Sequence, residues 1–253
     1  MTLNSRLAVC SVFSGNYNTA FWLKCQMEGL KKSVTNFDHL VYLNQADESL
    51  FSESIVVGKS DIAPLQRYRW DGFHFSTGMA GHIRGLRKLL SYCELSDYEC
   101  FLILDSDCFP VHEQWMDILV DNMSRFGKSF AAPARVENLD VFPHPCAFFT
   151  ADPHFLRFAG EWNENLLGWI TRDIICAGHP NEWFPLLKTN RCSKHPLLAT
   201  IYYDVFYHHG AGSREFNMRS LCYYDPILGR YPDADTILAE LKHDPQSFIA
   251  SIR

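Results

Sequence analysis

The chain has 253 residues, of which 47% are hydrophobic and 21% are charged. This length and this balance fit one sizeable folded domain and exclude a disordered chain. The 29 acidic and 23 basic side chains give a net charge of −6, and no basic run is present, so the composition argues against nucleic acid as a partner.

The first half of the chain alternates between short apolar runs and amphipathic segments. Residues 7–13 are apolar and end in a Ser-Gly-Asn turn, and residues 18–30 carry apolar side chains at helical spacing. Such alternation of strand and helix favours an open, mostly parallel sheet flanked by helices, the α/β class. The same patterns predict strands at 38–43, 54–57 and 100–104, helices at 76–92 and 112–126, and an irregular segment at 60–75.

The second half is less regular. An apolar run at 197–207 leads into two histidines, and residues 233–253 are expected to form two short helices. Pro245 follows Asp244 at a plausible first helical position. Because no repeat or linker interrupts the chain, we expect a single domain.

Neither the cysteines nor the ends of the chain indicate an extracellular or membrane protein. The 9 cysteines lack a Cys-x-x-Cys pair and are expected to be small buried residues in a reducing compartment. Residues 1–6 lack the apolar core of a signal peptide, and no apolar stretch is long enough to span a bilayer. We therefore expect a cytoplasmic protein without an integral membrane segment.

Two carboxylates follow the most apolar strand of the chain. Asp105, Ser106 and Asp107 stand where the run at 101–104 leaves the core. Two anions so close together are costly unless a cation lies beside them. Mn²⁺ or Mg²⁺ supplies that charge and keeps coordination positions open for phosphate oxygens. A plain Asp turn is the alternative, but the preceding strand and the β/α context favour the metal site.

In the type and position of this motif the chain resembles the GT-A glycosyltransferases, a Rossmann-like α/β superfamily. The resemblance implies a nucleotide diphosphate sugar as donor, with Asp107 as a direct metal ligand and Ser106 in the donor site. Asp105 would contact the ribose, or the metal through water. Residues 1–110 would form the nucleotide-sugar-binding half, residues 111–215 the acceptor and metal half, and residues 216–253 a helical tail.

A late pair of histidines is the second candidate for the metal centre. His208 and His209 precede a glycine-rich turn that ends at Arg214. A ring nitrogen can bind a metal, and Arg214 with the bare turn can approach a diphosphate. Several GT-A families are similar in carrying a late metal-binding histidine, and here we favour His209. The alternative is a histidine pair in an ordinary turn.

The other candidates are assigned to three tasks. In the helix before the motif, Arg84 and its neighbour His82 are expected near the nucleotide by resemblance, or else on the surface of an amphipathic helix. An inverting transferase also needs a carboxylate base, whereas a retaining one does not. The base candidates are Asp173, which we favour, Asp152 and Glu182; His144 is a candidate for a sugar hydroxyl or a cap between two prolines; Phe13, Ser14, Gly15, Asn44 and Asp47 are candidates for the nucleotide.

Two other functions fit an Asp-x-Asp motif. Phosphatases of the haloacid dehalogenase type also end a strand with it and use the first Asp as a nucleophile. Their motif normally lies near the N-terminus and continues differently from Cys108-Phe109. A catalytically inactive nucleotide-binding module of the same fold is the other alternative. For the transferase, the resemblance suggests a glycan or lipid-linked glycan acceptor in polysaccharide or glycoconjugate synthesis.

Overall fold

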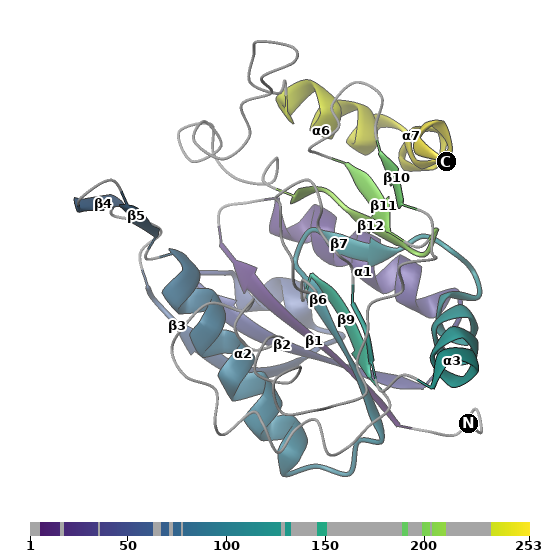
Figure 1. Ribbon diagram of the computed structural model, residues 1–253. Helices are drawn as coiled ribbons and strands as arrows, with labels where there is room; N and C mark the ends of the chain where they lie inside the picture. The colour runs from purple at the N-terminus through teal and green to yellow at the C-terminus, as the bar shows by residue number, and fades with distance from the viewer. Residues whose placement is uncertain are drawn as a thin grey trace.

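A computed structural model describes residues 6–15, 18–34, 36–62, 67–70, 73–76, 78–127, 130–132, 146–150, 189–191, 199–202, 204–210 and 234–253 (Figure 1). Helices flank both faces of a central sheet, and a smaller sheet lies beside the C-terminal helices. The elements are, in chain order, β1 (Leu7–Ser14), α1 (Thr19–Lys31), β2 (Phe37–Asn44), η1 (Glu48–Phe51), β3 (Ile55–Ser60), β4 (Arg67–Trp70), β5 (Phe73–Ser76), α2 (Gly78–Glu94), β6 (Cys100–Asp105), β7 (Cys108–Pro110), α3 (Trp115–Phe126), β8 (Phe130–Ala131), β9 (Ala147–Thr150), β10 (Thr189–Arg191), β11 (Thr200–Tyr202), β12 (Phe206–His208), α6 (Ala234–His243) and α7 (Pro245–Ile252).

The main sheet has six strands within the described residues, in the order β3-β2-β1-β6-β9-β8. β1 pairs in parallel with β2 and β6, and β2 pairs in parallel with β3, whereas β9 runs antiparallel to β6 and β8. The predicted α/β class with an open, mostly parallel sheet is confirmed. Because β1, β2 and β6 run in one direction, they end together at Ser14, Asn44 and Asp105, at the edge where such sheets bind ligands.

The strand β1 is buried on both faces because its side chains alternate between two layers. Ala8, Cys10 and Val12 pack in one cluster with the apolar side of α2. Leu7 and Val9 pack in another cluster with residues of α1 and α3. Figure 1 shows α2 on one face of the sheet and α1 on the other. This two-sided burial explains the mainly apolar run that marked the strand in the sequence.

The strand β7 starts directly after the Asp-Ser-Asp motif and belongs to a second, antiparallel sheet in the order β10-β11-β12-β7. Its register places His208 opposite Cys108. The sequence predicted that Pro110 ends a strand and that residues 197–207 form one run. Pro110 does end a strand, but that strand is β7 and not β6, and a turn at Asp204, with a left-handed φ of 60°, divides the run into β11 and β12. The pairing of β12 with β7 brings a distant segment to the motif.

Several element boundaries also differ from the prediction. β4 and β5 form an antiparallel hairpin in the segment that was predicted to be irregular. Alternating aromatic residues are typical of strands, and Phe73 and Phe75 supply that signal. The helices α2 and α3 begin later than predicted, at Gly78 and Trp115.

Two helices close the described chain, as predicted. The carboxylate of Asp244 caps α7 by accepting bonds from the backbone N–H and the hydroxyl of Ser247, at 3.1 and 2.7 Å, and Pro245 occupies the first turn. Apolar side chains of α6 and α7 join the cluster that contains Trp22 of α1 and Tyr207 of β12. The C-terminal helices therefore support α1 and β12.

A buried histidine in β2 is expected to make the stability of the fold depend on pH. His39 is 2% exposed, its Nδ1 lies 2.8 Å from the Ser54 hydroxyl, and burial lowers its pKa to about 4. The unfolded chain, with a pKa near 6.5 at this histidine, binds more protons between the two values. The free energy of unfolding should therefore fall by about 2 kcal/mol between about pH 7 and about pH 4.5 on account of His39 alone.

Urea unfolding of wild type and His39→Gln at the two pH values checks this expectation. The variant should be less sensitive to the acid shift by that amount, because glutamine keeps a polar group and does not titrate. Equal acid sensitivity of the two proteins would contradict it.

Candidate metal centre at the ends of the central strands

The Asp-Ser-Asp motif lies where the central strand β6 ends. Asp105 is the last residue of β6, Ser106 and Asp107 form a turn, and Cys108 starts β7. Five buried apolar residues in β6 fix the strand in the core, so the carboxylates emerge at the ligand-binding edge of the sheet. The position predicted for the motif is therefore the observed one.

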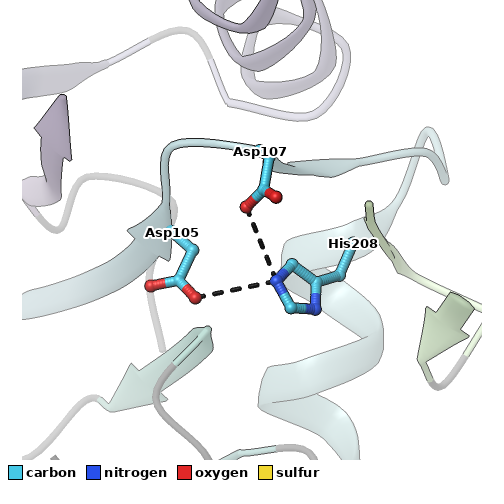
Figure 2. A group of neighbouring side chains, drawn as sticks. All are labelled: Asp105, Asp107 and His208. Carbon is cyan, nitrogen blue, oxygen red and sulfur yellow. Dashed lines mark ion pairs between the residues drawn. The ribbon is translucent and has the colours of Figure 1, made fainter. Parts of the chain in front are cut away.

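One imidazole joins the two carboxylates. The Nε2 atom of His208 lies 3.6 Å from an Asp105 carboxylate oxygen and 3.5 Å from one of Asp107 (Figure 2). The candidate ligand atoms of the three side chains lie within 4.8 Å of one another. The side chains of Asp107 and His208 are 7% and 5% exposed, whereas that of Asp105 is 22% exposed. The group is thus enclosed on one side and open at Asp105.

The groups around His208 favour a positive charge, which a proton on the imidazole supplies when no metal ion is bound. Burial disfavours the imidazolium, but Cys146 and the Asp107 carboxylate favour it, and the balance raises the pKa of His208 well above its ordinary value. A ligand histidine must be neutral, so a metal ion that binds here displaces that proton. The imidazolium and a divalent cation are therefore alternative partners for the same two carboxylates.

A second histidine approaches Asp105 from the helix α2. The Nε2 atom of His82 lies 3.7 Å from the Asp105 oxygen Oδ1, while His208 lies beside Oδ2. The resemblance suggested both His82 and Arg84 as residues near the nucleotide. The structure places His82 at the motif, and the side chain of Arg84 is exposed on the same helix.

Two carboxylates and one imidazole are suitable ligands for Mn²⁺ or Mg²⁺. Carboxylate oxygens suit both ions, and a neutral imidazole nitrogen suits first-row transition metals such as Mn²⁺. Three protein ligands leave positions of an octahedral ion open for phosphate oxygens or water. Asp105, Asp107 and His208 are the residues that can hold such an ion in the described part of the chain.

The choice between the two histidines is corrected by the structure. The sequence favoured His209, but His208 lies with the carboxylates. His209 is fully buried, its Nδ1 lies 2.7 Å from the Tyr207 hydroxyl, and its ring lies 5.1 Å from that of Trp22. Neighbouring side chains of an extended segment point to opposite sides, so only one of the pair can face the motif. The register of β12 was needed to decide which one.

Paired variants of the two histidines test this assignment. His208→Gln should weaken Mn²⁺ binding by at least about 10-fold because it removes the ligand nitrogen. His209→Gln should lower the thermal midpoint, because it disturbs packing against Trp22, and should leave the Mn²⁺ affinity within about 2-fold. A titration of free Mn²⁺ by electron paramagnetic resonance measures the Mn²⁺ affinity of both variants. Equal affinities of the two variants would remove His208 from the centre.

Three of the nucleotide candidates have structural roles. Phe13 is 1% exposed, and its ring packs against those of Phe51 and His39, so it is a core residue and not a platform for a base. Ser14 is half-buried, and its carbonyl accepts a bond from Thr19. The N–H of Gly15 donates to the Asn44 carbonyl at 3.0 Å. Phe13 was predicted to contact the nucleotide because it lies near the end of a strand. That position does not show which face of the sheet its side chain occupies.

Asn44 and the small residues of α2 are also explained by packing. The Asn44 amide accepts bonds from Ser60 and from the N–H of Ile62 and donates to the Ile62 carbonyl, all at 2.8–3.0 Å. It thereby holds the chain after β3. A Cβ at Gly81 would lie 3.0 Å from the Asn44 amide, and one at Gly85 would lie 2.7 Å from Val12. These glycines bring α2 close to the sheet.

The structure describes two of the remaining candidates. Ser106 lies in the turn of the motif and stays a prediction as a donor contact. Asp47 caps η1 by accepting a bond from the Ser49 N–H. The other candidates lie outside the described residues and stay predictions: Asp152, Asp173, Glu182, His144 and Arg214.

Within the described residues, no helix combines the length and the apolar character that crossing a bilayer requires.

Comparisons with known proteins give likenesses to solved structures at low sequence identity. No protein-family model matches the chain, and no curated protein matches its sequence. Among solved structures, the mannosyltransferase PcManGT from Pyrobaculum calidifontis, in complex with GDP-Man and Mn²⁺, is similar with a TM-score of 0.43 and 10% identity, over 65% of this chain and 49% of that one. TarS from S. aureus is similar with a TM-score of 0.39 and 12% identity, over 64% and 51%. The chain thus spans about half the length of each.

Proposed function

We propose that the chain is a metal-dependent glycosyltransferase that moves a sugar from a nucleotide diphosphate sugar to a hydroxyl acceptor. The observation that carries the proposal is the group of Asp105, Asp107 and His208 at the carboxyl end of a parallel sheet. A nucleotide bound at that edge would bring its diphosphate to the open side of the group, where Asp105 is the most exposed member.

The proposed reaction needs charge stabilisation at the leaving diphosphate. The bond between the sugar C1 and the diphosphate oxygen breaks, a bond from the acceptor oxygen to C1 forms, and the hydroxyl proton passes to a base. A bound divalent ion would neutralise charge on the departing diphosphate. Asp107 and His208, the two buried members, would fix the ion. Asp105 would bind the ion directly or through a water molecule, or contact the ribose, and Arg214 would meet the diphosphate.

Three further parts of the proposal are supported only by the resemblance to GT-A enzymes. These are the base, for which Asp173 is our first candidate, the acceptor, proposed to be a glycan or lipid-linked glycan, and a place in polysaccharide or glycoconjugate synthesis. None of them affects the test of the metal centre.

Turnover separates a transferase from a phosphatase or an inactive module. The purified chain is incubated with Mn²⁺, a panel of nucleotide sugars and simple sugar acceptors, and release of nucleoside diphosphate is measured with and without chelator. The same preparation is tested on p-nitrophenyl phosphate. We expect metal-dependent release of one nucleoside diphosphate and no hydrolysis of the aryl phosphate. Hydrolysis of the aryl phosphate without nucleoside diphosphate release would replace the transferase by the phosphatase.

A further inference from the structure

The helix α1 lies unusually close to the segment that carries the metal motif. A Cβ on Gly29 would lie 2.3 Å from the Pro110 carbonyl oxygen and 3.1 Å from the Pro110 ring. Only glycine permits this approach, because the nearest atom belongs to the backbone. Gln26 lies three residues before Gly29 and therefore on the same face of the helix. Its side chain points at the same segment.

Gln26 is fully buried, and both polar atoms of its side-chain amide make hydrogen bonds. Its Nε2 atom donates to the carbonyl oxygens of Asp105 and Cys108, at 2.8 and 2.9 Å, and lies 3.4 Å from that of Ser106. Its Oε1 atom accepts a bond from the Ser11 hydroxyl of β1 at 3.2 Å. The bonds to Asp105 and Cys108 use both hydrogens of the amide nitrogen. The bond from Ser11 fixes the orientation of the amide plane.

The two carbonyls bound by Gln26 stand on either side of the turn between Asp105 and Asp107. The intervening carbonyl of Asp107 accepts a bond from the N–H of His209 at 3.1 Å. The backbone of the turn is therefore held by a side chain on one side and by the end of β12 on the other. A buried carbonyl that loses its donor is costly, so the turn would shift to find another one. Any such shift moves the two carboxylates relative to His208.

We propose that Gln26 is the positioning residue of the metal centre: its buried amide clamps both ends of the Asp-Ser-Asp turn and sets the carboxylates at the spacing that a divalent ion needs. The inference rests on the metal site of the proposed function and is independent of the sugar, the nucleotide and the acceptor. Gln26 does not touch the ion. It acts through the backbone of Asp105 and Cys108, with Ser11 as its anchor.

Gln26→Met tests the clamp because methionine has a similar length and volume but does not donate to the carbonyls. Mn²⁺ affinity is measured by a paramagnetic resonance titration, and folding by the thermal midpoint. We expect the affinity to fall by about 10-fold or more, the size of effect typical of groups that orient metal ligands. The spectrum of bound Mn²⁺ should broaden, which records a distorted ligand geometry that a loss of stability alone does not produce.

Two further variants make the outcome decisive. Leu90→Ala in α2 opens a cavity at a fully buried site whose cluster contains no residue of α1, β7 or β12, and it should lose thermal stability while keeping the Mn²⁺ affinity within about 2-fold. Ser11→Ala leaves the donors of Gln26 intact but frees its oxygen, so it should weaken Mn²⁺ binding less than Gln26→Met and in the same direction. If Gln26→Met does not fold, the Mn²⁺ affinity of Ser11→Ala is the test of the clamp.

Unchanged affinity in the folded Gln26→Met protein, or in Ser11→Ala where that variant decides, overturns the clamp while leaving the metal centre in place. Failure of the wild type itself to bind Mn²⁺ overturns both the clamp and the proposed function. The two failures are therefore distinguished by the wild-type titration.

Discussion

Replacing Asp107 by asparagine is expected to weaken Mn²⁺ binding by at least about 100-fold and to abolish metal-dependent binding of a nucleoside diphosphate. Asp107 is the carboxylate that lies beside His208 with its side chain only 7% exposed. Its amide analogue keeps the shape and one oxygen but removes the charge that balances the cation. Because the change also relieves repulsion from Asp105, we expect the variant to fold.

Calorimetric titration with Mn²⁺, alone and with nucleotide, measures the effect of Asp107→Asn. The matched control is Asp121→Asn, the same change at an exposed position of α3. The control should bind like the wild type. Wild-type affinity in Asp107→Asn would place the metal centre elsewhere in the chain.

The second large effect is expected at Gly15, where the cause is steric. A Cβ there would lie 1.7 Å from the Gln45 carbonyl oxygen and 2.5 Å from its carbon, so the ends of β1 and β2 would have to separate. Both atoms belong to the backbone and cannot rotate away. Gly15→Ala should therefore lower the free energy of unfolding by about 3 kcal/mol, at the upper end of the usual cost of overpacking.

Urea unfolding compares Gly15→Ala with Gly58→Ala. At Gly58 the added carbon would meet only the ring of Tyr42, at 3.0 Å, so the cost should be much smaller. A Gly15→Ala protein as stable as the wild type would show that the two strand ends separate freely. The absence of a side chain at Gly15 would then be better explained by contact with a nucleotide.

The parts of the fold that were predictable from the sequence are those that depend on local pattern. β6 is an apolar run up to Asp105 and β1 is mainly apolar because both faces of the sheet are covered, and α2 shows its apolar side at helical spacing. The Asp-Ser-Asp motif was found for the same reason, since two carboxylates directly after a buried strand are unusual without a cation.

The parts that the sequence did not predict depend on pairing between distant segments. His208 joins the carboxylates only because β12 pairs with β7 in a register that sets it opposite Cys108. Phe13 and Asn44 stand at strand ends, where a ligand contact and a packing contact have the same sequence signal. Gln26 gives no signal at all, because a glutamine in an amphipathic helix is expected on its solvent side.

The central claim is that a nucleoside diphosphate binds through a metal ion held by Asp105, Asp107 and His208. A calorimetric panel of UDP, GDP, CDP and dTDP, with Mn²⁺ and then with excess chelator, tests it most directly. We predict that one of the four binds in the presence of Mn²⁺ and that chelator abolishes the binding. Binding that is equally strong in chelator, or no binding of any of the four with Mn²⁺, would contradict the claim.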